Sequence, residues 1–186
     1  NIALLLACYN GEKYMREQMD SLYGQTFKDW TLFVRDDGST DSTMDIIKEY
    51  QTRYSNIVVM DNSGKRLGAR DNFMALLENV DSQYYMFVDE DDVWLPNKIW
   101  NEYEKIKRLD ANKPALVITN LKLVDGNLNV ISESFWKSIK FDYRVFNSFR
   151  YQSYMCYVTG CTMMLNQKAK AVSFPMPSYA PMHDWW

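Results

Sequence analysis

The stretch IALLLACYNGE, residues 2–12, sets the fold of this chain. Residues 2–8 are an unbroken apolar run, which is typical of a parallel strand covered on both faces. A polar turn follows, and apolar residues then recur at helical spacing at Tyr14, Met15, Met19, Leu22 and Tyr23. A buried strand followed by an amphipathic helix predicts the first unit of an α/β fold.

The same alternation of strand and helix patterns continues to about residue 110. Apolar strand patterns occur at 30–35, 56–61 and 84–88, and helical stripes of apolar residues lie between them and at 99–106. Beyond this point the pattern is mixed, with strands expected around Asp125-Gly126-Asn127 and at 160–166. We therefore expect one α/β domain with a Rossmann-like, mostly parallel sheet flanked by helices and a mixed C-terminal half.

Composition excludes several classes of protein. The chain has 186 residues, of which 47% are hydrophobic, and its net charge of −3 disfavours nucleic-acid binding by bulk electrostatics. No apolar run approaches the roughly 18 residues of a membrane span. One histidine and three cysteines without paired spacing leave carboxylates as the expected metal ligands, and the cysteines favour a reduced, cytosolic protein.

Three polar clusters follow predicted strands, at 8–12 (CYNGE), 35–41 (RDDGSTD) and 89–92 (DEDD). In open parallel sheets ligands bind beyond the carboxyl ends of the strands, so these clusters predict one shared site. Asp89 and Asp91 are two residues apart and project to one side, where a divalent cation would relieve their mutual repulsion. The alternative for Asp91 and Asp92 is helix capping near Pro96.

The doubled acid Asp36-Asp37 has two interpretations. Asp-Gly-Ser-Thr is ordinary turn sequence, but a carboxylate directly after an apolar strand also suits a nucleoside contact. No G-x-G-x-x-G motif follows the first strand, which argues against a dinucleotide cofactor. The basic residues in GKRLGARDN (64–72) either hold a diphosphate or belong to a solvated loop, and the aromatic residues of 135–157 either stack on sugars or form core.

Taken in order, several motifs resemble one family. They are ACYNGEKYMREQMDSLYGQTF (7–27), VRDDGSTDST (34–43), GARDNF (68–73), FVDEDDVWLPNKI (87–99), GCTMMLN (160–166) and HDWW (183–186). Together they resemble the family-2 inverting glycosyltransferases with the GT-A fold, and most of all the rhamnosyltransferase-like group that builds bacterial surface polysaccharide. The resemblance covers nearly the whole chain.

The resemblance implies a role for each matching residue. Asp184 matches the general base, and Asp91 with Asp89 matches the D-x-D pair that holds Mn²⁺ or Mg²⁺. The positions that match the nucleotide-sugar contacts are Ala7, Tyr9, Asn10, Glu12, Asp36, Asp37, Arg70, Asp89 and Glu90. Relatives often have a small or neutral residue where this chain has Glu90, which leaves open whether Glu90 or Asp92 joins the metal site.

The resemblance further implies the partners and the organisation of the chain. The expected donor is a UDP- or dTDP-linked sugar and the expected acceptor is a saccharide or a lipid-linked glycan, in the cytoplasm or at the inner face of the membrane. Residues 1–110 are expected to bind the nucleotide and 111–186 to face the acceptor, with a C-terminal part of the parent protein missing. The rival hypotheses are a sugar nucleotidyltransferase, which normally has a glycine-rich basic loop after its first strand, and a non-catalytic binding module, which needs no late acid such as Asp184.

Overall fold

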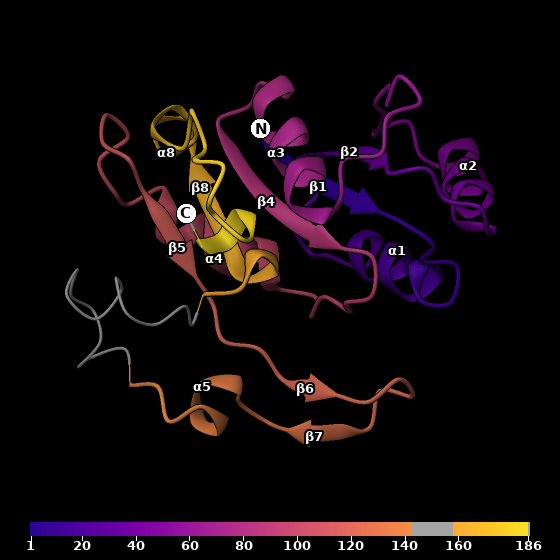
Figure 1. The fold of residues 1–186 in the computed structure, drawn as a ribbon. Coiled ribbons are helices and arrows are strands. Elements are labelled where there is room, and N and C mark those ends of the chain that lie inside the picture. The colour runs from indigo at the N-terminus through magenta and orange to yellow at the C-terminus, as the bar shows by residue number, and fades with distance from the viewer. Residues whose placement is uncertain (143–157, 186) are drawn as a thin grey trace.

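The computed structural model describes residues 1–142 and 158–185. Its centre is a six-stranded sheet in the order β3-β2-β1-β4-β8-β5 (Figure 1). The strands are β1 (Ile2–Cys8), β2 (Trp30–Asp36), β3 (Ile57–Val59), β4 (Tyr84–Asp89), β5 (Leu116–Ile118) and β8 (Met163–Asn166). The first four are parallel, and β8 runs antiparallel between β4 and β5. The predicted mostly parallel sheet with a mixed second half is confirmed.

Two hydrophobic cores cover the two faces of the sheet. On one face, even-numbered residues of β1 pack with α1 (Met15–Tyr23), α2 (Thr43–Arg53) and α4 (Lys98–Ile106). On the other, odd-numbered residues of β1 pack with α3 (Ala69–Asn79) and with part of α8 (Gln167–Val172). Every residue of β1 is buried, as its unbroken apolar sequence predicts for a strand covered on both sides.

The register of the strands brings the polar clusters to one edge of the sheet. Cys8 at the end of β1 pairs with Asp36 of β2, and Ala7 pairs with Asp89 of β4. The segments after β1, β2 and β4 therefore leave the sheet at the same level. The convergence predicted from the sequence is confirmed.

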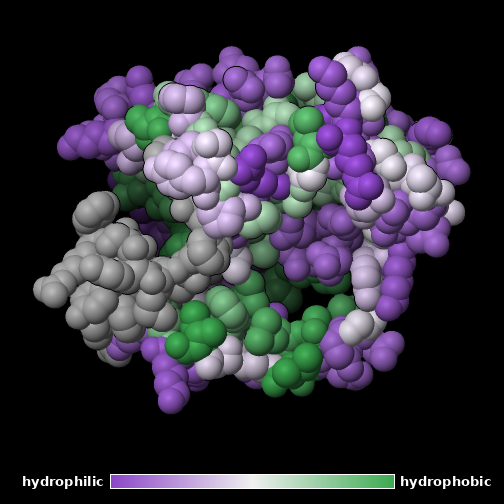
Figure 2. Space-filling view, viewed as in Figure 1, coloured by the Kyte–Doolittle hydropathy of each residue, from purple (hydrophilic) through white to green (hydrophobic). Residues whose placement is uncertain are grey.

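The second half holds the smaller elements. The hairpin of β6 (Leu123–Val124) and β7 (Val130–Ser132) forms a separate sheet, and α5 (Phe135–Ser138) follows it. Figure 1 shows these elements below the main sheet, and Figure 2 shows a hollow between the hairpin and the body of the domain, with apolar residues along the hairpin. Within the described residues, no helix is long and apolar enough to cross a membrane.

One predicted strand is shorter than its sequence pattern. Residues 160–166 were expected to form a strand throughout, but Gly160–Thr162 form a 3-10 turn, η1, before β8 begins at Met163. A second 3-10 turn, η2, spans His183–Trp185. Because η1 packs against β4 and η2 packs against α3, the two turns lie at the same edge as the acidic cluster.

Candidate functional site

Hydrogen bonds join the loop after β1 to the loop after β2. Asn10, in the left-handed region with a φ of 53°, donates its amide to Ser39 Oγ and accepts the Thr40 amide at Oδ1 (2.9 and 2.8 Å). Glu12 Oε2 accepts the amide of Ser42 at 2.9 Å. The side chains of Asn10 and Glu12 thus set the shape of these loops. Whether they also contact a nucleotide stays a prediction.

Asp36 closes the turn after β2. Its Oδ2 accepts the amides of Gly38 (3.1 Å) and Ser39 (2.9 Å), and its Oδ1 accepts the Ser39 hydroxyl. Gly38 has a φ of 88°, a conformation that glycine adopts without steric cost. Asp36 therefore folds the loop that ends in the N-terminus of α2.

Asp37 is buried and fastens the loop at 61–68 to the end of β2. Its two carboxylate oxygens accept the amides of Leu67 and Gly68, both at 2.7 Å, and Arg35 Nη1 lies 3.2 Å from Oδ1. Both members of the Arg35–Asp37 ion pair are almost fully buried. A buried ion pair is stable only where further hydrogen bonds satisfy both partners, and Asp37 has them.

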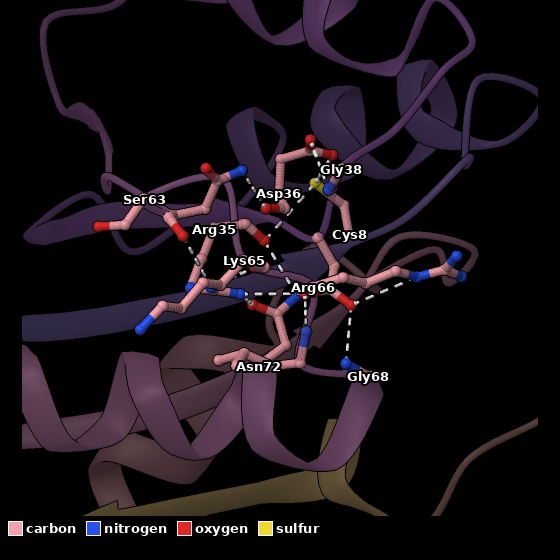
Figure 3. A network of polar contacts seen from close by, with 12 residues as sticks. Cys8, Arg35, Asp36, Gly38, Ser63, Lys65, Arg66, Gly68 and Asn72 are labelled. Atoms are coloured by element: carbon pink, nitrogen blue, oxygen red, sulfur yellow. Dashed lines mark hydrogen bonds and ion pairs between the residues drawn. The ribbon is translucent and has the colours of Figure 1, made fainter.

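Arg35 completes this network with its guanidinium and its backbone carbonyl (Figure 3). Its guanidinium donates to Asn72 Oδ1 (2.6 Å) and to the carbonyl of Lys65 (3.0 Å), while Asn72 Nδ2 donates to the carbonyl of Arg35 (3.1 Å). Sequence reasoning missed Arg35 and Asn72. The one available signal was an arginine at the end of a strand that is otherwise buried.

Tyr9 and Ala7 lie where β1 leaves the sheet. The Arg66 guanidinium lies 3.8 Å from the centre of the Tyr9 ring, and both side chains are exposed. Ala7 is buried beside Asp89, with which it is in register. The guanidinium over the ring is a cation–π contact, and a nucleotide contact for Tyr9 stays a prediction.

The acids after β4 form a second cluster, in which burial and neighbouring negative charges raise the pKa values of the carboxyl groups. Burial, and then the charges of Asp92, Asp91, Glu90 and Asp184, raise the pKa of Asp89 to about 7. Burial is also the main cause that raises the pKa of Glu90 and of Asp92. Asp91 is exposed at the turn. Clustered carboxylates with raised pKa values mark a candidate functional site.

Glu90 and Asp92 point to different neighbours. The side chain of Glu90 packs against Gly11, where an added Cβ would lie 2.6 Å from Glu90 Cγ. Asp92 accepts a hydrogen bond from the Cys161 thiol. Ligand atoms of Asp89, Asp92 and Cys161 all lie within 4.8 Å of one another. Asp92 therefore joins Asp89 in space, while the direct metal contact expected for Asp91 stays a prediction.

Cys161 departs from the sequence expectation for the cysteines. Cys8 is buried as expected, but Cys161 is only partly buried and lies among acids rather than among apolar side chains alone. Burial and the charges of Asp92 and Asp89 raise the pKa of its thiol, which keeps it protonated. Cys156 lies outside the described residues, as do Tyr143, Tyr151 and Tyr154 of the aromatic-rich segment.

Asp184 is brought to the same site by η2. Its Oδ2 accepts the amide of Gly160 at 3.0 Å, and its charge is close enough to raise the pKa of Asp89. The neighbouring His183 is buried between Phe73 and Phe87. The structure thus unites the late acid with the cluster after β4, although 92 residues separate Asp184 from Asp92 along the chain.

Arg70 is engaged by the C-terminal segment. Its guanidinium forms a two-bonded pair with Asp71 (2.6 and 2.9 Å) and donates to the carbonyls of Ser178 (3.1 Å) and Ala180 (2.8 Å). Arg70 therefore ties α3 to the loop that precedes η2. A diphosphate contact for Arg70 stays a prediction.

The comparisons with known proteins agree with this architecture. The family model described as Glycosyl transferase family 2 matches residues 4–172. The chain belongs to this family. The resemblance found in the sequence motifs is confirmed at the level of the family.

Two curated relatives illustrate the similarity. The chain is 37% identical over 111 residues to the dTDP-rhamnosyl transferase RfbG of Shigella flexneri, a match that covers 58% of this chain and 38% of that protein. It is 31% identical over 130 residues to the poly(ribitol-phosphate) beta-glucosyltransferase of Bacillus spizizenii, covering 67% and 20%. The chain therefore spans well under half the length of these relatives.

Solved structures show the fold. The mannosyltransferase PcManGT of Pyrobaculum calidifontis, in complex with GDP-Man and Mn²⁺, superposes with a TM-score of 0.72 at 15% identity, covering 99% of this chain and 49% of that one. TarS 1–349 of S. aureus, in complex with UDP-GlcNAc, gives a TM-score of 0.60 at 25% identity, covering 68% and 36%. The chain has the GT-A type fold of these glycosyltransferases.

Proposed function

We propose that this chain is the donor-binding and catalytic region of an inverting glycosyltransferase. It moves a sugar from a nucleotide-diphospho-sugar to a saccharide or lipid-linked acceptor in bacterial surface polysaccharide synthesis. The observation that carries the proposal is the position of Asp184. Its carboxylate lies near enough to Asp89 to raise the pKa of that acid, and it accepts the amide of Gly160 in η1.

The acids after β4 fit a divalent metal ion. Asp89 and Asp92 offer hard carboxylate oxygens, which Mg²⁺ and Mn²⁺ prefer, and their repulsion is relieved when a cation is bound. We assign the ion to Asp89 and Asp91, with Asp92 beside them. When bound, the ion would neutralise charge that builds up on the departing diphosphate.

The loops after β1 and β2 would hold the nucleoside. Ala7, Tyr9 and Asn10 line the end of β1, and either Asp36 or Asp37 would contact the base or ribose through lone pairs that the loop amides leave open. The similarity to a dTDP-rhamnosyl transferase favours a dTDP- or UDP-linked donor. Residues 1–110 would then form the donor half and 111–186 the acceptor half.

Asp184 would act as the general base. In a single displacement with inversion, the acceptor hydroxyl attacks the anomeric carbon from the face opposite the leaving diphosphate and loses its proton to a carboxylate. Asp184 is not one of the acids that we assign to the metal, so we assign it the role of accepting that proton. A cytoplasmic location, at the inner face of the membrane where a lipid-linked acceptor would lie, follows from these partners.

The test is Asp184→Asn in the intact protein, assayed with its donor and acceptor. Asparagine keeps the shape and can still accept the Gly160 amide, but it cannot accept a proton. We expect turnover to fall by roughly 10²–10⁴-fold, the usual scale of general base catalysis, while donor and metal affinity stay nearly unchanged. Asp45→Asn, an exposed acid on α2, is the control and should match the wild type.

Two outcomes would contradict this assignment. Retained turnover in Asp184→Asn would place the base elsewhere or favour a non-catalytic binding module. A collapse of donor affinity would make Asp184 a ligand of the donor or of the metal.

A further inference from the structure

Gly160 of η1 lies directly against the turn that carries Asp184. A Cβ built on Gly160 would overlap His183 Nε2 and would lie 3.0 Å from its Cε1. Real Cβ atoms essentially never approach other atoms so closely, so any side chain at position 160 would push the imidazole away. Glycine is therefore the only residue that fits at position 160 without displacing the ring.

His183 cannot move aside easily. Its ring is packed between Phe73 of α3 and Phe87 of β4, at centroid distances of 4.3 and 4.7 Å. It is 7% exposed, and neither of its nitrogens has a hydrogen-bond partner among the described residues. Burial lowers the pKa of His183 to about 4, so the imidazole is neutral and behaves as part of the apolar core. Its role in this packing is to anchor η2.

The same glycine also binds the next residue of the turn. The Gly160 amide donates to Asp184 Oδ2 at 3.0 Å. His183 and Asp184 are consecutive, so a displacement of the imidazole moves the backbone from which the Asp184 side chain extends. Gly160 thus has two contacts with η2. Its lack of a side chain leaves room for the His183 ring, and its N–H donates to the Asp184 carboxylate.

We propose that Gly160 is a positioning residue that, with His183, sets the place of the Asp184 carboxylate beside the acidic cluster. This inference rests on the proposed role of Asp184 as general base. It assigns a function to the contact between η1 and η2. The absence of a Cβ at position 160 lets the His183 ring pack closely, and the Gly160 amide orients the Asp184 carboxylate.

The experiment is a double-mutant cycle of Gly160→Ala and His183→Ala in the intact protein. Gly160→Ala retains the N–H but adds the Cβ that meets the imidazole. A displacement of about 1 Å at a reacting group can cost on the order of 10²-fold in rate, so we expect kcat to fall by about 10- to 100-fold. The KM for the donor should change by less than about threefold, because the atoms nearest to the added Cβ all belong to His183, which we do not assign to donor binding.

The second half of the cycle removes the His183 ring, which the added Cβ would otherwise meet. In a His183→Ala background the added methyl no longer meets a ring, so Gly160→Ala should lower kcat by less than about threefold relative to His183→Ala alone. Gly126→Ala, in the β6–β7 turn, is the matched control, because a Cβ there meets its nearest neighbour at 3.4 Å; it should leave kcat unchanged. Thermal unfolding of all variants identifies any that fail to fold.

Each result decides the proposal. Gly160→Ala with wild-type kcat, or with equal losses of kcat in both backgrounds, would overturn it, as would a loss confined to donor KM. Failure of the proposed function is distinguishable, because it would appear as retained turnover in Asp184→Asn. In that case the coupling between positions 160 and 183 should still appear in the free energy of unfolding, and its absence there would also refute the contact.

Discussion

Two acidic clusters follow neighbouring strands of the same sheet and have opposite environments. Asp36 and Asp37, after β2, accept backbone amides and an arginine, so their charges are compensated within the fold. Asp89 and Asp92, after β4, have pKa values raised chiefly by burial, and the charges of neighbouring acids raise them further. The first cluster holds loops in place, whereas the acids of the second repel one another within the fold.

The difference shows that acid composition alone does not indicate whether the charges of a cluster are compensated within the fold. Both clusters are consecutive acids at the carboxyl end of a buried strand. What separates them is the number of N–H groups directed at each carboxylate, which depends on loops that return from distant parts of the chain. The comparison makes opposite predictions for the stability of variants in the two clusters.

The largest stability effect is expected at the compensated cluster. Asp37→Asn would leave Arg35 buried without its counter-ion and would direct an amide N–H at the amide of Leu67 or Gly68. Breaking a buried ion pair and orphaning a buried donor should lower the free energy of unfolding by about 2–4 kcal/mol. Urea unfolding, with the exposed Asp45→Asn as control, measures it. Wild-type stability in Asp37→Asn would show that the network in Figure 3 contributes little.

A smaller effect of opposite sign is expected at the cluster after β4. The pKa of Asp89 in the folded protein, about 7, lies above the value of about 3.9 of an unfolded chain. The folded state therefore binds more protons between about pH 4 and 7, and the metal-free protein loses stability as the pH rises through this window. The Asp89→Asn variant has no ionisable group at this position, so its stability should not fall for this reason in this pH range.

We therefore expect Asp89→Asn, in EDTA, to be more stable than the wild type by about 1–2 kcal/mol at pH 8, with the difference vanishing near pH 4. Urea unfolding at several pH values measures this difference. A variant that is less stable than the wild type at pH 8, or a difference independent of pH, would show that Asp89 is compensated in the fold.

Much of the fold followed from the sequence because its signals are local. The apolar run of β1, the stripes of α1 to α4 and the acids after β4 are each contained in a short stretch, and parallel strands bring their ends together whatever the loops do. The boundary at Gly160 was misjudged because Cys161 and Thr162 have the apolar and β-branched character of a strand. The turn there is closed by the amide and hydroxyl of Thr162, which both donate to the carbonyl of Thr159, and it packs against β4.

The parts of the site that the sequence did not reveal depend on contacts between distant residues. Arg35 meets Asn72, Cys161 meets Asp92, and Arg70 meets the carbonyls of Ser178 and Ala180. No spacing rule links such pairs. Asp184 was found through its resemblance to a family motif, whereas Gly160, which holds it, belonged to a motif whose pattern indicated only a strand.

The most direct test of the account is calorimetric titration of UDP and dTDP into the wild type and Asp91→Asn, each in Mn²⁺ and in EDTA. The account predicts that the wild type binds one of these nucleotides at least about tenfold more tightly in Mn²⁺, since the acids after β4 and the diphosphate share the ion. It predicts that Asp91→Asn loses this gain while keeping its fold. Equal affinity in Mn²⁺ and EDTA, unaffected by Asp91→Asn, would contradict the assignment of this cluster to the metal and the donor.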